Sequence, residues 1–315
     1  MSVSDKQSPI SDKQSPTSIL HTYPLQINTT FQLTQKPLNK CFVCGCVRNV
    51  AKYLPAVFQN IRKLQTVFDE ICILMAYDKS DDNTLDLLKS IQKTTPRFYI
   101  IVLTEPLTDI RTKNIANARN RILQDIRDLQ NTTPEFREYS YFCMIDMDNV
   151  CAGKINADIL PQYLDRTDWD ALTFYRETYY DIWALSIRPF VFSCWHWYTR
   201  EIALRVIQTT QSYFIEKIRE LPKTELLEVE SAFCGFGLYR LSKFIDCEYS
   251  PRFALPYMSS KMLAENERAV QLPLMPEYRE FYGDCEHRWF HMEAIHKHGA
   301  KIRISPLPLF DTIVD

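Results

Sequence analysis

The sequence of 315 residues has little glycine, no excess of charge of either sign and no long apolar run. Its 37 Lys and Arg residues are balanced by 39 Asp and Glu residues, so it has no strongly basic character for nonspecific nucleic-acid binding. No apolar stretch approaches the roughly 18 residues of a membrane helix, and Met1 to Pro16 lacks the apolar core of a secretory signal. We therefore expect a cytoplasmic protein with no membrane span and no nucleic-acid partner.

Six glycines are too few for a small, loop-rich scaffold held together by disulfides, although the chain has ten cysteines. Cysteines such as Cys72 and Cys143 lie inside apolar stretches rather than in spaced loop pairs. Cys41, Cys44 and Cys46 share one apolar segment, which favours core packing over metal binding. We expect reduced, buried thiols in a chain whose 46% apolar residues can form a large core.

The N-terminal segment contains a tandem repeat. Residues 4–9 and 11–16 both read Ser-Asp-Lys-Gln-Ser-Pro, and the repeat has no large apolar residue that could join a core. This composition predicts a disordered tail over residues 1–20.

From Lys40 onward, short apolar runs alternate with helical patterns, which is typical of βα units around a parallel sheet. Strands are predicted over residues 41–47, 71–77, 98–103 and 139–145, and helices over residues 53–68, 84–92 and 115–129. The sequence therefore predicts an α/β fold of Rossmann-like character, with a mostly parallel sheet flanked by helices. The second half is less regular and rich in aromatic residues, with helices predicted over 202–219 and 284–297 and a loop and strand over 232–239.

Polar residues follow each predicted strand, and ligands of open parallel sheets bind outside the carboxyl ends of the strands. Arg48 and Asn49 follow the first strand, and a segment from Asp78 to Thr84 follows the second. Asp81 or Asp82 can cap the next helix, but capping does not require Asp78 as well. Asp78 is therefore a candidate for contact with a base or ribose.

Asp146-Met147-Asp148 directly follows the fourth predicted strand. Alternate residues at a strand end can both face one ligand while the residue between them packs inward. Paired carboxylates suit Mg²⁺ or Mn²⁺, which in turn holds a diphosphate. The competing interpretation is a solvated turn, but the buried character of the preceding strand favours a metal site.

Basic residues gather where the helix after the third strand begins, namely Arg111, Lys113 and Arg119. Cations at a helix N-terminus oppose the helix dipole unless an anion is bound. A bound diphosphate would explain them, and a solvated basic face is the alternative.

Three of these segments, in this order, resemble glycosyltransferases with the GT-A fold. Residues 76–84 resemble their Asp-Gly-Ser-x-Asp-Gly-Thr segment, residues 115–120 their Ala-Arg-Asn helix start, and Asp146-Met147-Asp148 their Asp-x-Asp. More loosely, residues 179–185, 230–240 and 285–287 are similar to the fungal capsule-associated mannosyltransferase family. Lys79 and Asn83 depart from the glycines that are usual in the first segment.

The resemblance implies roles for particular residues. Asp146 and Asp148 would hold the metal, with His287 completing its coordination. The nucleotide-sugar-binding set would be Arg48, Asn49, Asp78, Arg111, Asn114, Arg119 and Asp146. Residues 40–150 would form the nucleotide-sugar-binding half and residues 151–315 the acceptor-binding half of one domain.

An inverting transfer needs a carboxylate that accepts the proton of the acceptor hydroxyl, and the candidates are Glu286, Glu230 and Asp181. A retaining enzyme can lack such a base, and the sequence leaves both open. A zinc site made from Cys285, His287 and His291 is disfavoured because a fourth ligand with suitable spacing is missing.

The expected function is metal-dependent transfer of a hexosyl group from a UDP- or GDP-sugar to a glycan or glycoconjugate hydroxyl, with Mn²⁺ or Mg²⁺. One alternative is a noncatalytic module that retains a nucleotide- or glycan-binding cleft. Another is a nucleotidyltransferase, which is disfavoured because residues 44–48 are not a glycine-rich, basic phosphate loop.

Overall fold

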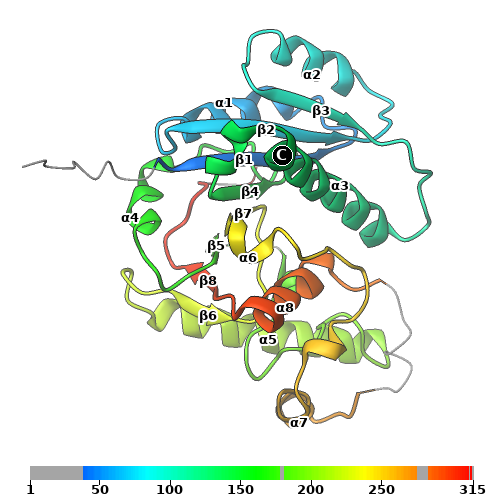
Figure 1. The fold of residues 1–315 in the computed structure, drawn as a ribbon. Helices are drawn as coiled ribbons and strands as arrows, with labels where there is room; N and C mark the ends of the chain where they lie inside the picture. The colour runs from blue at the N-terminus through cyan, green and yellow to red at the C-terminus, as the bar shows by residue number, and fades with distance from the viewer. Residues whose placement is uncertain (1–37, 178–180, 275–282, 312, 314–315) are drawn as a thin grey trace, which may run out of the picture. The chain divides into compact units, whose positions relative to one another are not determined.

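The computed structural model describes residues 38–177, 181–274, 283–311 and 313, so the predicted tail of residues 1–20 lies outside the described residues. The described residues from Leu38 onward form one compact unit. Within the described residues an eight-stranded sheet has the order β3-β2-β1-β4-β7-β5-β8-β6 (Figure 1).

The first half contains the predicted parallel βα units. Its strands are β1 (Lys40–Val47), β2 (Glu70–Tyr77), β3 (Phe98–Val102) and β4 (Tyr141–Ile145), and its helices are α1 (Leu54–Leu64), α2 (Thr84–Gln92) and α3 (Arg111–Thr132). β1 pairs in parallel with both β2 and β4, and β2 pairs in parallel with β3. α1 buries Val57, Phe58 and Ile61 at the spacing that predicted it.

The second half makes the sheet mixed. Its strands are β5 (Ala171–Phe174), β6 (Leu227–Val229), β7 (Phe236–Arg240) and β8 (Ile302–Ser305), and its α-helices are α4 (Pro161–Leu164), α5 (Arg200–Glu220), α6 (Leu241–Phe244), α7 (Ser260–Val270) and α8 (Glu286–His298). Short 3₁₀ helices are η1 (Pro134–Glu138), η2 (Ala157–Ile159), η3 (Ile182–Ala184) and η4 (Leu255–Tyr257). β7 runs antiparallel to β4 and β5, and β6 runs antiparallel to β8. The predicted α/β fold with a mostly parallel, helix-flanked sheet is confirmed.

Two hydrophobic clusters cover the two faces of the sheet. Alternate residues of β1 belong to different clusters, with Cys41 and Val43 in one and Phe42 and Cys44 in the other. This is the arrangement expected of a strand covered on both faces. All ten cysteines are free thiols, and all but Cys46 are buried, as the sequence predicts.

Among the described residues, no helix is both long enough and apolar enough to cross a membrane.

Candidate active site

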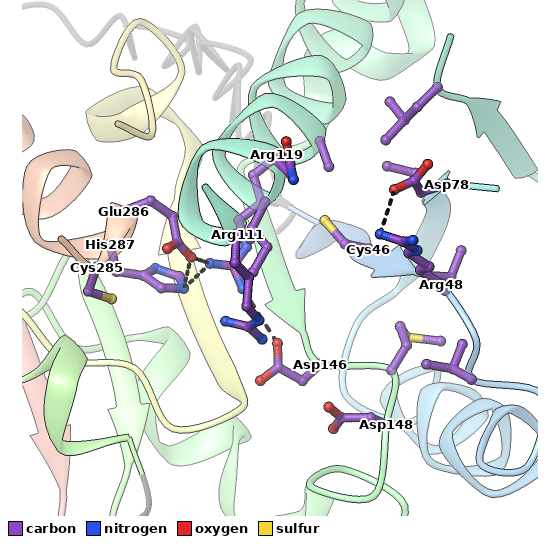
Figure 2. A pocket seen from close by; sticks show the side chains of 18 of the residues that line it. Cys46, Arg48, Asp78, Arg111, Arg119, Asp146, Asp148, Cys285, Glu286 and His287 are labelled. Atoms are coloured by element: carbon purple, nitrogen blue, oxygen red, sulfur yellow. Dashed lines mark hydrogen bonds and ion pairs between the residues drawn. The ribbon is translucent and has the colours of Figure 1, made fainter. Parts of the chain in front are cut away.

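A cavity of about 550 Å³ opens at the carboxyl ends of β1, β2 and β4 (Figure 2). It is also lined by the first turns of α3, by the start of α8 and by the segment around η3. The polar and aromatic lining residues are Cys46, Arg48, Asp78, Thr108, Asp109, Arg111, Asn114, Arg119, Asp146, Asp148, Asp181, Trp183, Phe233, Cys285, Glu286 and His287.

The Asp146-Met147-Asp148 segment leaves β4 with its middle side chain buried and its two carboxylates lining the cavity. Met147 packs over Gly45 of β1, where an added Cβ would lie 2.7 Å from Met147 Cγ. The Asp146 N–H donates to Gly235 O at 2.8 Å, and Asp148 Oδ1 accepts from the Val150 N–H at 3.1 Å. Glycine at position 45 therefore lets Met147 anchor the segment that presents both carboxylates.

The donor chemistry of this segment fits a hard divalent cation. Asp146 and Asp148 supply carboxylate oxygens, and Mg²⁺ sites commonly use one or two carboxylates together with substrate phosphates. His287, the third predicted ligand, lines the same cavity, where its Nε2 is 2.5 Å from Arg119 Nη1 and its ring stacks on Phe233. Asp146 and Asp148 could hold a cation whose other ligands come from substrate and water, and metal coordination by His287 stays a prediction.

A compact group of three potential ligands lies away from the cavity. In the described part of the chain, one group of three has its ligand atoms within 4.8 Å of one another, and it consists of Asp246, Cys247 and His298. None of these residues lines the cavity. Cys285, His287 and His291, the alternative zinc set, do not form such a group among the described residues. The His291 ring instead contacts Ser231 Oγ at 3.0 Å and the Tyr239 hydroxyl at 3.2 Å.

Arg119 connects the metal-competent segment to α8. Its side chain is buried, its Nη1 donates to Glu286 Oε1, and its Nη2 lies 3.4 Å from Asp146 Oδ1 (Figure 2). Its guanidinium also lies 5.1 Å from the Phe233 ring centre and 5.5 Å from that of Tyr249. Burial lowers the pKa of Arg119, but the carboxylates of Glu286 and Asp146 more than reverse this, so the side chain is a permanent cation.

His287 is a neutral neighbour of this cation. Burial, and then the charge of Arg119, hold the pKa of His287 well below its ordinary value. Its place beside Arg119 indicates a role in packing and orienting the guanidinium.

Asp181 is a carboxyl at the cavity with a raised pKa. It caps η3 by accepting the Ala184 N–H at 3.2 Å, and it lines the cavity. Burial, followed by the nearby carboxylates of Asp146 and Glu286, raises the pKa of Asp181 to about 7. A general base with a pKa near the working pH is the most effective one.

The other two base candidates are placed differently. Glu286 lines the cavity, but its carboxylate is engaged by Arg119. Glu230 is not among the lining residues, and its Oε1 accepts from Arg188 Nε at 2.6 Å. The structure therefore brings Asp181 and Glu286 to the cavity and leaves Glu230 outside it.

Arg48 and Asp78 lie together at the far end of the cavity from Glu286, with Arg48 Nη1 3.8 Å from Asp78 Oδ2 (Figure 2). Asp82 provides the turn's structural contacts, since it accepts the N–H groups of Ala51 and Thr84, each at 3.0 Å. The contact of Asp78 with a base or ribose stays a prediction.

The side chains of the two asparagines in the predicted nucleotide-binding set make hydrogen bonds to nearby backbone groups. Asn49 has a left-handed backbone with φ of 53°, its Oδ1 accepts the Asp81 N–H at 2.7 Å, and it does not line the cavity. Asn114 lines the cavity, but its amide binds both the N–H and the carbonyl of Thr108. Arg111, the exposed first residue of α3, does line the cavity.

Trp183 and Phe233 also line the cavity, although the sequence did not identify them as site residues. Both belong to segments noted for their resemblance, but an aromatic residue in such a segment is equally typical of a core. Only the fold shows that they face the cavity.

No family model matches the chain, and no curated protein sequence matches it. Solved structures that resemble it include the Staphylococcus aureus protein TarS, residues 1–349, in complex with UDP-GlcNAc, at 13% identity and a TM-score of 0.45, covering 88% of this chain and 59% of that one. Another is the mannosyltransferase PcManGT from Pyrobaculum calidifontis in complex with GDP-Man and Mn²⁺, at 12% identity and a TM-score of 0.36, covering 67% of this chain and 49% of that one. The chain thus spans about half of the length of these proteins. Likeness at this level carries no argument about function, which must come from the site itself.

Proposed function

We propose that the chain is a metal-dependent glycosyltransferase of GT-A type that moves a sugar from a nucleoside diphosphate sugar to a hydroxyl acceptor. The observation that carries the proposal is the content of one cavity at the carboxyl edge of the sheet. It combines the Asp146 and Asp148 carboxylates, the Arg48 and Asp78 pair, and a carboxyl, Asp181, with a pKa of about 7.

The order of these groups matches the parts of a nucleoside diphosphate sugar. Arg48 and Asp78 offer a donor and an acceptor for the nucleoside, and Arg111 a cation for the diphosphate. Asp146 and Asp148 would hold Mn²⁺ or Mg²⁺, which when bound supplies positive charge to the diphosphate as it leaves. Asp181 and Trp183 line the part that is left for the sugar and the acceptor.

We propose that the transfer proceeds with inversion and that Asp181 is the base. The acceptor hydroxyl oxygen forms a bond to the anomeric carbon, the bond from that carbon to the diphosphate oxygen breaks, and the diphosphate leaves with the electron pair. Asp181 accepts the hydroxyl proton. In a retaining reaction the leaving phosphate would accept that proton instead, so the requirement for Asp181 tests the stereochemical course.

The donor and the division of labour along the chain belong to the same proposal. We propose a UDP- or GDP-hexose as donor, with residues 40–150 binding the nucleotide sugar and residues 151–315 binding the acceptor. A cytoplasmic location agrees with this donor. The cavity lining supports the division, because it takes Arg48, Asp78 and Asp148 from the first segment and Asp181 and Glu286 from the second.

Product analysis tests the function. The purified protein is incubated with Mn²⁺ and, in turn, UDP-, GDP- and CMP-linked sugars, and the released phosphates are identified by chromatography. Release of a nucleoside diphosphate from UDP- or GDP-sugar is expected. Pyrophosphate from a nucleoside triphosphate and a sugar phosphate would indicate a nucleotidyltransferase, and the absence of any turnover would favour a binding module.

A further inference from the structure

Two tryptophans extend from the cavity to the protein surface. Trp183 lines the cavity and is partly buried, and Trp195 is 50% exposed. Their ring centres are 6.2 Å apart and their planes meet at 60°, an edge-to-face contact. The two indoles, which we call the Trp183–Trp195 platform, are therefore in contact, with Trp183 lining the cavity and Trp195 half-exposed to solvent.

The backbone of Trp183 is bound by a buried arginine. The Trp183 carbonyl accepts from Arg288 Nη2 at 2.6 Å, and Arg288 is itself fully buried and paired with Asp284 at 2.7 Å. Asp181 caps the same 3₁₀ turn, two residues before Trp183. Trp183, the inner member of the platform, and the carboxyl that we propose as base thus belong to one short 3₁₀ turn.

The charge at this end of the cavity selects the kind of acceptor. Among the described lining residues here, Asp181 and Glu286 are acidic, and His287 is uncharged. Arg119 is the nearby cation, but Glu286 and Asp146 already engage it. For an anionic acceptor, such as a polyol phosphate, Arg119 is therefore a cation that two carboxylates already share.

We infer that the Trp183–Trp195 platform binds a neutral pyranose ring of the acceptor and presents one of its hydroxyls to Asp181. The C–H face of a pyranose is apolar and flat, so it can cover indole surface, while its ring-edge hydroxyls reach polar groups. A peptide acceptor would also gain from aromatic contacts, but it lacks the combination of an apolar face and a projecting ring hydroxyl. This inference rests on the proposed transferase function and specifies its acceptor.

Binding without turnover tests the platform independently of the reaction. Saturation-transfer NMR measures binding of methyl α-D-mannopyranoside, methyl β-D-glucopyranoside and methyl β-D-galactopyranoside to the full chain with no donor added. The variants are Trp195→Ala and, as a matched exposed aromatic control, Tyr99→Ala, which lies on β3 and does not line the cavity. sn-Glycerol 1-phosphate and a serine-containing peptide represent the other acceptor classes.

We expect at least one pyranoside to bind, with affinity that falls about tenfold in Trp195→Ala and is unchanged in Tyr99→Ala. Equal pyranoside binding by both variants, or binding of glycerol phosphate or peptide but of no pyranoside, would overturn the inference.

A second readout separates this inference from the proposed function. Release of nucleoside diphosphate is measured with and without the bound pyranoside, and the pyranoside should stimulate it with a KM that rises about tenfold in Trp195→Ala. Pyranoside binding that depends on Trp195, without release from any donor, would support the platform while rejecting the transferase. Release that no pyranoside stimulates and that Trp195→Ala leaves unaltered would support the transferase and reject the platform.

Discussion

Asp146 and Asp148 are both carboxylates at the end of β4, but their side chains contact different groups. Asp146 lies 3.4 Å from Arg119, whereas Asp148 accepts a hydrogen bond only from its own turn, the Val150 N–H, among the bonds described for its side chain. Asp148 is therefore the carboxylate whose removal affects a bound cation with the least disturbance of the buried charges around Arg119.

The substitution Asp148→Asn is expected to lower turnover by about 100-fold or more, since an amide is a much weaker ligand for a hard cation. Asparagine keeps an oxygen for the Val150 N–H, so the thermal midpoint should be nearly unchanged. Nucleoside diphosphate release across a Mn²⁺ titration, alongside thermal denaturation, measures both. Full turnover at saturating Mn²⁺ would contradict a role in metal binding.

Asp181 should give the reaction its pH dependence. With a pKa of about 7, its basic form is gained as pH rises through neutrality, so the rate should rise with pH between about 6 and 8. Asp181→Asn should reduce the rate by about 10² to 10⁴-fold and abolish that rise. A variant that retains the wild-type rate and pH profile would indicate that the reaction does not use this base.

The same carboxyl should also affect stability. In the unfolded chain it ionises near pH 3.9, while in the folded chain it stays protonated up to about 7, so the folded state binds the extra proton between these values. Asp181 therefore weakens folding progressively as pH rises from about 4 to 7, and Asp181→Asn should become more stable relative to wild type over that window. Urea denaturation at pH 5 and pH 8 measures the difference, and an unchanged difference would refute the elevated pKa.

At the scale of elements, the ion pair between Arg119 and Glu286 joins α3 to the first turn of α8. Both side chains are buried, at 7% and 6% exposure. A buried guanidinium that loses its main counter-charge is costly, whereas solvent-exposed pairs such as Lys217–Glu220 of α5 contribute little.

Glu286→Ala is therefore expected to lower the free energy of unfolding by about 3–5 kcal/mol. Glu220→Ala serves as the matched control, in an exposed pair on α5, and should have little effect. Chemical denaturation measures both variants. Similar stabilities for the two would show that Asp146, Phe233 and Tyr249 suffice to hold Arg119.

The packing of β1 against the end of β4 gives a second prediction at this scale. Gly45→Ala places a Cβ 2.7 Å from Met147 Cγ and 3.1 Å from the Ile145 carbonyl, so the Met147 side chain, which lies between the two aspartates, must shift. We expect a loss of about 1–3 kcal/mol in stability and weaker activation by Mn²⁺.

The double variant Gly45→Ala, Met147→Ala distinguishes this clash from a general effect on β1. Removing the Met147 side chain relieves the contact, so Mn²⁺ activation should recover partly relative to Gly45→Ala alone. Strictly additive losses would show that Met147 does not transmit the effect.

At the scale of the whole molecule, the cavity takes its walls from both halves of the sequence, so an occupant stabilises the folded unit as a whole. A ligand that binds only the native state at 100 times its Kd adds about 2.7 kcal/mol to the free energy of unfolding. We expect UDP or GDP to raise the thermal midpoint of the protein, and more so with Mn²⁺ than with a chelator. A shift that is the same with and without the cation would contradict metal-assisted diphosphate binding, and the nucleotide that gives the larger shift identifies the donor class.

The sequence by itself determined the first half of the molecule and one edge of its site. Alternating apolar runs and amphipathic helices specify parallel βα units, and parallel strands bring their carboxyl ends to a common edge whatever the rest of the chain does. That is why the positions of Arg48, Asp78, Asp146 and Asp148 along the chain are enough to predict that they face one cavity.

Only the tertiary structure decided the remainder. β5, β6 and β8 are too short to show a periodicity, and each exists because of the strand beside it. The placement of His287 beside Arg119, the separation of Glu230 from the cavity, and the raised pKa of Asp181 all depend on residues distant in sequence. Burial and charge proximity are properties of three-dimensional neighbours, so no local pattern could have chosen among the three candidate bases.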